Sequence, residues 1–349
     1  MRRDVISASA ALLLVACSHA PPRDFAPDPR LITQIREIRI VPQESWACPG
    51  VPIHADYEAI FADGSSVTFA RSYNKKQPPR LHVRFLERKS PDAVARQDGD
   101  WVAEPDPLAT MSTGFRLTAT LRANPSITST VVLPPTYDCM SRQFAFAGGS
   151  GIMGGNGWNG PDVTVRLDIR HSPFYERLYV AAIDVGGARP FSVVGDSSAV
   201  GSADWLMVES RGGDGAAGVA GMNGIDGAPG FPGCPGGAGG QGQDGHDGGP
   251  GGDGGSGGRI TIIVPPARSG LARLVRTASW GGTGGSGGAG GTGGRGGSGG
   301  AGLFDANNQP CTSGADGSPG HDGLQGRSGF PGSPGPTTTV ARAATKEPS

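Results

Sequence analysis

The sequence has few aromatic residues, almost no net charge and no long apolar run beyond its N-terminus. Phe, Trp and Tyr make up 6% of the 349 residues, so a large hydrocarbon core is not expected in every part of the chain. The net charge is −1 and both signs are interspersed, which gives no basic surface, and we expect no nucleic-acid partner. After residue 16, no apolar run is long enough to cross a bilayer.

The sequence also lacks the motifs that would indicate an enzyme. No G-x-x-x-x-G-K-[ST] phosphate loop occurs. The pattern G-x-S-x-G occurs at 254–258, 284–288 and 296–300, but no strand-to-helix turn surrounds it. His246-Asp247 and His321-Asp322 recur in similar contexts, and we interpret them as solvated positions. We therefore expect no catalytic residue, no cofactor and no metal.

The N-terminus carries a processing signal. Arg2 and Arg3 precede the short apolar run Ile6–Val15, and Leu14-Val15-Ala16-Cys17 resembles a bacterial lipobox. The resemblance implies a signal peptide over 1–16 and a lipid on Cys17, which would anchor the protein without spanning the membrane. By the same resemblance, Ser18 in the next position implies the outer membrane, on its periplasmic face or at the cell surface. Residues 17–33 are polar and rich in proline, which predicts a tether.

Residues 34–140 are typical of short β-strands separated by turns. Expected strands include Ile38–Pro42, Ala55–Phe61, Leu81–Leu86 and Gly114–Leu121, and about seven such strands favour an antiparallel sandwich. The region is similar to bacterial Ig-like domains of the invasin and intimin kind through five motifs: I-x-I-V-P at 38–42, Cys48-Pro49-Gly50, F-A-D-G-S at 61–65, Trp101, and G-F-R-L-T-A-T at 114–120. The resemblance implies a disulfide between Cys48 and Cys139, which would tie the first edge of the domain to the last.

Glycine, in contrast, is abundant, at 62 residues, and much of it recurs every third residue. The regular series cover 212–257, 281–302 and 314–335. A period of three is neither the α-helical period nor that of a strand. It matches extended left-handed helices with three residues per turn and a rise of about 3.1 Å per residue.

The glycine series are flanked by strands in a repeated unit of strand, excursion and strand. A short excursion covers 148–160, and two long ones follow at 212–258 and 281–335. Turns divide the long excursions into arm 1 (212–233), arm 2 (236–258), arm 3 (281–302) and arm 4 (314–335). We expect the excursions to leave and rejoin a second β-sheet within a domain spanning 141–341, followed by a disordered tail over 342–349.

The four arms have nearly equal length, so the two turns are expected at the same far end, about 70 Å from the sheet. Cys234 lies in one turn and Cys311 in the other. A disulfide needs its two Cα atoms within about 7 Å, and this arrangement predicts the pair Cys234–Cys311. Because lipidation would occupy the thiol of Cys17, the four remaining cysteines would then form two disulfides.

Many triplets contain two glycines, which a collagen rod does not need. A packed bundle does use them, because glycine faces let backbones approach and bond to each other. Arm 4 and much of arm 1 have one glycine per triplet, so a collagen-like trimer and a disordered low-complexity segment stay open as alternatives. The stretch Gly248–Ile262 resembles the glycine-rich fold of Obg-type proteins, and the bundle is similar to those of phage tail-fibre tip adhesins and insect antifreeze proteins.

The predicted fold is all-β: an Ig-like β-sandwich followed by a second β-domain with extended left-handed polyglycine-type helices packed as a bundle. The candidate contact residues at the tip are Phe231, Pro232, Leu303, Phe304, Asn307 and Asn308. We expect a monomeric, non-enzymatic envelope lipoprotein that presents this tip for adhesion to a cell-surface, matrix or polysaccharide ligand. A structural spacer and an ice- or polysaccharide-binding face on the arms are the alternative functions.

Overall fold

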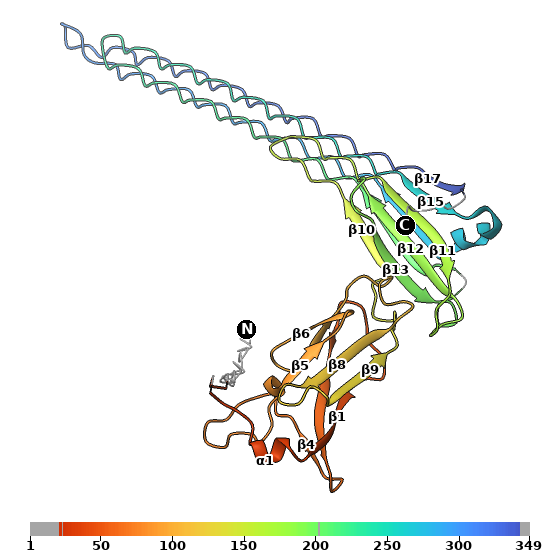
Figure 1. The fold of residues 1–349 in the computed structure, drawn as a ribbon. Coiled ribbons are helices and arrows are strands. Elements are labelled where there is room, and N and C mark those ends of the chain that lie inside the picture. The colour runs from red at the N-terminus through yellow and green to blue at the C-terminus, as the bar shows by residue number, and fades with distance from the viewer. Residues whose placement is uncertain (1–20, 23, 202, 343–349) are drawn as a thin grey trace, which may run out of the picture. The chain divides into compact units, whose positions relative to one another are not determined.

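The computed structural model describes residues 21–22, 24–201 and 203–342, and Cys17 and the residues after 342 lie outside this part. The chain is mostly β, with several small sheets and few helices, which confirms the expected class at this level (Figure 1). It divides into two compact units. Unit 1 contains the described residues up to Met140 together with Ser172–Glu176, and unit 2 contains the rest.

Unit 1 is built from three antiparallel three-stranded sheets, with strand orders β1-β3-β4, β2-β7-β6 and β5-β8-β9. Its elements are α1 (Pro29–Ile32), β1 (Ile35–Pro42), β2 (Pro52–Ile53), β3 (Ala55–Phe61), β4 (Ser66–Thr68), the 3₁₀ helix η1 (Val83–Phe85), β5 (Leu86–Lys89), β6 (Ala93–Ala95), β7 (Trp101–Ala103), β8 (Phe115–Leu121) and β9 (Thr128–Leu133).

Buried and more exposed residues alternate along β3 and β8, and the buried ones contribute to the core of unit 1. Every second side chain faces inward, as the period of two in a strand requires. Tyr57, Trp101, Phe115 and Leu117 are among the fully buried side chains, and one continuous apolar cluster joins all three sheets. Cys48 and Cys139 form a disulfide with a Cα–Cα distance of 6.5 Å, the pairing expected above.

Two expectations for unit 1 need correction. The segment Leu81–Leu86 was expected as a strand, but it turns through η1, where the His82 side chain accepts a hydrogen bond from the backbone N–H of Arg84. The expected tether also ends earlier than residue 33. Leu31 and Ile32 in α1 are buried, and Phe25 packs on the core, since these apolar side chains gain more by burial than by remaining in water.

Unit 2 contains a three-stranded sheet of order β10-β14-β16 and a five-stranded sheet of order β13-β12-β11-β15-β17. Its elements are β10 (Gln143–Ala147), β11 (Val163–Arg170), β12 (Leu178–Val185), β13 (Phe191–Asp196), β14 (Leu206–Arg211), β15 (Ile260–Val264), the 3₁₀ helix η2 (Pro266–Leu274), β16 (Val275–Trp280) and β17 (Thr337–Ala341). Inward side chains of both sheets share one apolar cluster.

The strand–excursion–strand repeat determines this topology. Strands β10, β14 and β16, which precede the three excursions, pair in parallel in one sheet. Strands β11, β15 and β17, which follow the excursions, pair in parallel in the other. The single sheet expected from the sequence is therefore two sheets, because each excursion returns to a different layer from the one it left.

The four arms run side by side away from the two sheets of unit 2 (Figure 1). They contain no regular strand or α-helix, and their backbone hydrogen bonds recur every third residue. In the bonds from arm 1 to arm 3, Gly215 N donates to Thr283 O at 2.8 Å, Gly218 N to Ser286 O at 2.8 Å, and the series continues to Gly233. The bonds therefore follow the glycine period, and at least every third amide of an arm donates to another arm.

Arms 2 and 3 are the inner arms. Each bonds to the other three arms, whereas the described hydrogen bonds of arms 1 and 4 to other arms go only to arms 2 and 3. Gly285 N of arm 3 donates to Gly252 O of arm 2 at 2.8 Å, and Gly317 N of arm 4 donates to Gly297 O of arm 3 at 2.8 Å. The short excursion 148–160 lies against arms 1 and 2 near the sheets, where Gly213 N donates to Trp158 O at 2.8 Å.

Candidate functional site at the tip of the arms

The two turns of the long excursions meet at the far end of the arms. The backbone N–H of Gly233 donates to Ala301 O at 3.0 Å, and that of Leu303 donates to Gly233 O at 2.7 Å. Cys234 and Cys311 form a disulfide across the turns with a Cα–Cα distance of 5.2 Å. The structure thus makes the cysteine pair that the arm lengths predict, and it brings both turns into one tip.

Three large apolar side chains of this tip are exposed to solvent. The exposed fraction is 85% for Phe231, 66% for Phe304 and 50% for Leu303. Pro232, Asn307 and Asn308 are exposed as well. Every tip residue expected from the sequence is therefore at the surface. Leaving apolar groups of this size in water is unfavourable, so they are candidates for a contact surface.

Asp305 organises the second turn, a role that the sequence analysis missed. Its carboxylate oxygen Oδ1 accepts the backbone N–H groups of Asn307 at 2.9 Å and Gln309 at 2.8 Å. Asn308 has a φ of 60°, a left-handed conformation that asparagine tolerates better than most residues. An aspartate followed by a run of amide residues is a signal for such a turn, and it could have been recognised in the sequence.

A second group of residues missed from the sequence joins the arms to the sheets. Ser210 of β14 is fully buried, and its hydroxyl donates to Pro161 O at 2.8 Å and accepts from Gly258 N at 3.2 Å. Ser279 of β16 repeats the pattern, donating to Gly258 O at 2.8 Å and accepting from Gly335 N at 3.0 Å. The two serines are register partners. The shared pattern Ser-x-Gly-Gly at 210–213 and 279–282 is the signal that could have revealed them.

Asx side chains link neighbouring arms along their length. Asp214 of arm 1 accepts the backbone N–H of Thr283 in arm 3 at 2.7 Å, and this amide, with the Thr283 hydroxyl, holds the pKa of Asp214 below its usual value. In the same way, Asx side chains of arm 1 accept backbone N–H groups of arm 3, those of arm 2 accept from arm 4, and those of arm 4 accept from arm 3. Asp244 and Asp247 take part through the amides of His321 and Leu324. These carboxylates therefore satisfy backbone groups, and no group of three metal-ligating side chains occurs in the described part of the chain.

Arm 1 also presents a row of apolar side chains. Val219, Met222 and Ile225 occupy the position after glycine in successive triplets, and their exposed fractions are 60%, 69% and 66%. The same position further along the arm is Phe231 at the tip. The row follows directly from the period of three, which places equivalent positions on one side of the arm.

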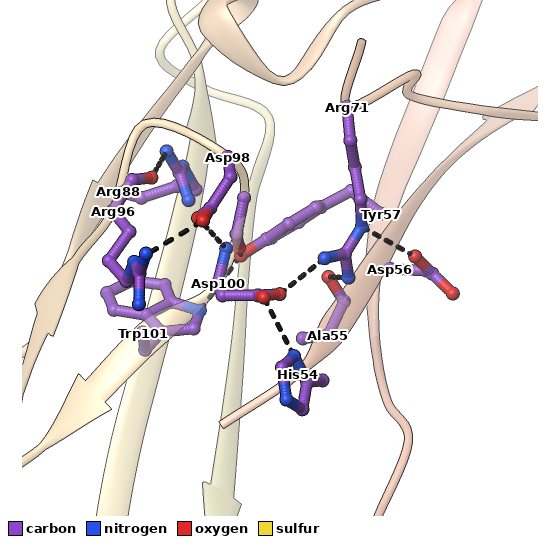
Figure 2. A network of polar contacts seen from close by, with 11 residues as sticks. His54, Ala55, Asp56, Tyr57, Arg71, Arg88, Arg96, Asp98, Asp100 and Trp101 are labelled. Atoms are coloured by element: carbon purple, nitrogen blue, oxygen red, sulfur yellow. Dashed lines mark hydrogen bonds and ion pairs between the residues drawn. The ribbon is translucent and has the colours of Figure 1, made fainter. Parts of the chain in front are cut away.

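The main polar cluster of unit 1 surrounds Asp100 (Figure 2). Its carboxylate accepts from the Arg71 guanidinium and lies 2.7 Å from His54 Nδ1. Arg71 also donates to Ala55 O at 2.8 Å and to Asp56 at 3.1 Å. These contacts fasten β3 to the segment leading into β7. Because Arg71 and His54 already take both carboxylate oxygens of Asp100, we interpret the cluster as structural.

Tyr57 continues this cluster into the core. Its hydroxyl donates to Gly99 O at 2.8 Å and accepts from Trp101 Nε1 at 2.8 Å, so both aromatic residues are buried with their polar atoms bonded (Figure 2). Burial raises the pKa of Tyr57 despite the nearby Arg88. A phenol held neutral in this way stabilises the domain and contributes no charge.

Unit 1 also has an open hollow of about 650 Å³ beside its disulfide, and unit 2 has one of about 370 Å³ near the start of the three-stranded sheet. The first is lined by Ser45, Trp46, Pro134, Pro135, Thr136, Asp138, Cys139, Phe174 and Tyr175. The second contains Arg142, Arg276 and Trp205 among its lining residues. Neither brings together side chains that form a recognisable catalytic set.

No protein-family model matches the chain, and neither a curated protein nor a solved structure matches it. No helix among the described residues is both long enough and apolar enough to cross a membrane.

Proposed function

We propose that the chain is a monomeric, non-enzymatic envelope lipoprotein that presents the tip of its arms for contact with an opposing surface. In this proposal Cys17 carries the lipid that holds the protein at the outer membrane. Unit 1 is an Ig-like β-sandwich, and the arms are left-handed polyglycine-type helices packed as a bundle. The observation that carries the proposal is the exposed apolar tip closed by the Cys234–Cys311 disulfide.

The hydrogen bonds between arms favour a stiff stalk that carries this tip. They recur every third residue along all four arms and join segments of one chain. A collagen-like trimer would need glycine at one position in three and bonds between three chains. The two-glycine triplets of arms 2 and 3 and the bonds within one chain favour a monomer.

A spacer would have no need of exposed aromatic residues at its end. The apolar row of arm 1 supports one alternative, a binding face along the arms for a polysaccharide or another extended ligand. Val219, Met222 and Ile225 would then carry binding, in place of Phe231 and Phe304.

Cell adhesion tests the proposal and its alternative together. In the native host, the wild-type protein is compared with a Phe231→Ser/Phe304→Ser variant and with a matched Met222→Ser/Ile225→Ser variant, each at equal surface level. We expect attachment to neighbouring cells or their matrix to fall at least about tenfold in the tip variant, since each lost aromatic contact is worth about 1.5–3 kcal/mol when buried. Loss in the arm variant alone would favour the arm face, and unchanged attachment in both would refute adhesion.

A further inference from the structure

We propose that the surface contacted by the tip is a lipid bilayer, and that Phe231, Leu303 and Phe304 enter its interfacial region. This inference rests on the proposed function and specifies the partner of the same site. The three side chains come from both turns, and the bond from Leu303 N to Gly233 O and the disulfide hold the turns together. All three side chains therefore lie at the same end of the arms.

The charge of the tip matches a neutral lipid interface. In the segments 228–242 and 298–315, the only ionisable side chain is Asp305. Its carboxylate is already engaged by two backbone N–H groups of its own turn. With no lysine or arginine, the tip has no means of attracting anionic lipids, phosphates or acidic proteins. Apolar transfer is the remaining driving force.

The backbone of the second turn is also suited to a medium that supplies few hydrogen bonds. Asp305 N donates to Gln309 O at 2.9 Å, Asn308 N to Asp305 O at 3.0 Å, and Cys311 N to Leu303 O at 2.8 Å. The Asn307 and Gln309 amides bond to the Asp305 carboxylate. Because the N–H groups of Asp305, Asn307, Asn308, Gln309 and Cys311 are bonded within the turn, it can approach hydrocarbon at a lower cost than a loop without such bonds.

The size of the tip favours lipid over a folded protein partner. A stable protein interface buries about 800 Å² on each side, whereas two aromatic side chains contribute about 150–250 Å² each. A bilayer requires no complementary pocket and accepts apolar groups in any number. Contact through one tip is expected to be weak and reversible, and many copies on one cell would strengthen it.

Vesicle flotation tests the inference with the whole chain from position 17 onward, carrying Cys17→Ser so that no attached lipid contributes. The probes are vesicles of phosphatidylcholine alone and vesicles with phosphatidylglycerol added, at low and high salt. We expect binding to phosphatidylcholine that is insensitive to salt. The Phe231→Ser/Phe304→Ser variant should lower the bound fraction at least about tenfold, and the Met222→Ser/Ile225→Ser control should bind like wild type.

Disulfide mapping and the unfolding temperature of each variant establish that loss of binding is not loss of the fold. Absence of binding to phosphatidylcholine, equal loss in the control, or binding that needs phosphatidylglycerol and disappears in salt would each overturn the inference. Tip-dependent adhesion to cells without binding to vesicles would overturn the lipid partner while leaving the proposed function intact.

Discussion

His82 is the buried titratable residue of unit 1 with the clearest consequence for stability. It is 4% exposed, its Nδ1 accepts the Arg84 N–H at 3.2 Å, and its Nε2 is buried without a partner. Burial, with a smaller contribution from Arg84, lowers its pKa below the usual value of 6.5. Protonation would place a proton on the nitrogen that now accepts, and would bury a charge.

We predict that the unfolding free energy of unit 1 falls as the pH drops below about 6.5. The folded pKa is the lower of the two, so the unfolded chain takes up the proton first. The stabilisation is complete above the unfolded pKa and is lost on the way down through the folded one. Urea unfolding followed by tryptophan fluorescence at several pH values measures the slope. His82→Asn keeps an acceptor without titrating and should flatten the slope, and an unchanged slope would refute this assignment.

Ser210, where the arms join the sheets, is predicted to contribute to the stability of unit 2. Its hydroxyl bonds to two backbone groups in a fully buried position. Ser210→Ala leaves the Gly258 amide and the Pro161 carbonyl without that partner, and should lower the unfolding free energy by about 1–3 kcal/mol. Chemical denaturation measures the loss, and exposed Ser198→Ala serves as the control. Equal stability of the two variants would contradict a role for Ser210 in the join.

Among single residues, those predicted correctly from the sequence were the ones identified by their spacing along the chain. The Cys234–Cys311 pairing followed from arm length, and the tip residues followed from the position of the turns. Ser210, Ser279 and Asp305 were missed because the partners of their side chains are backbone groups far away in the chain or in a local turn. The residue type alone does not indicate such a partner, and only the neighbouring residues do: Ser-x-Gly-Gly for the serines and the following amide residues for Asp305.

The glycine content of arm 3 reflects how closely the other arms approach it. In arm 3 every triplet through Gly300 has two glycines, and neither has room for a side chain. A Cβ on Gly284 would lie 2.1 Å from Gly329 O, and one on Gly285 would lie 1.9 Å from Ala216 O. Arms 1 and 4 bond to two arms and need one glycine per triplet. The single-glycine triplets that resemble collagen are therefore explained by an outer position.

The room beside each glycine predicts unequal effects of alanine at different positions of the arms. Gly285→Ala should destabilise unit 2 by roughly 1–3 kcal/mol or more, because the new methyl group meets a backbone oxygen that cannot move away alone. Gly249→Ala is the matched control, since its Cβ would lie 3.3 Å from the nearest atom, Val219 N. Thermal unfolding of the two variants gives the comparison. A Gly285→Ala protein as stable as the control would refute the close packing of arm 3.

The tip disulfide is predicted to stabilise unit 2. Cys234 and Cys311 are 77 residues apart, and closing a loop of that length is worth about 4 kcal/mol in the chain-entropy model. The Cys234→Ser/Cys311→Ser variant should lose a large part of this stabilisation in urea unfolding of unit 2. The Cys48→Ser/Cys139→Ser variant removes the disulfide of unit 1, so comparing the two variants separates the contribution of each disulfide to stability. No loss in the tip variant would mean that the arms alone hold the turns.

The arms were predictable because their period is unique to them, and the flanking strands because they are apolar. The division into two sheets was not. An apolar strand pattern indicates that a strand is buried but does not identify the strand beside it. The failure at Leu81–Leu86 has a similar origin, since Leu81, Val83, Phe85 and Leu86 are all buried and only the His82–Arg84 contact reveals the turn.

For the whole molecule, the bonds within one chain predict a monomer. Light scattering on the chain with Cys17→Ser should give the mass of one chain, and the collagen alternative requires three. Mapping the disulfides of the same sample should recover Cys48–Cys139 and Cys234–Cys311 within single chains. A trimer, or disulfides between chains, would contradict the intramolecular bundle.

The hydrogen bonds between arms also constrain how the protein can change in length. In the parallel series from arm 1 to arm 3, the two bonded residues keep a constant separation, 68 positions from Gly215 to Thr283 and again from Gly218 to Ser286. A triplet inserted into one arm would preserve the glycine period, yet it would shift one turn by about 9 Å relative to the other. The cysteines would then be too far apart to join. Evolution can therefore lengthen or shorten the arms only by matched changes in all four, so the reach of the tip is inherited as a single trait.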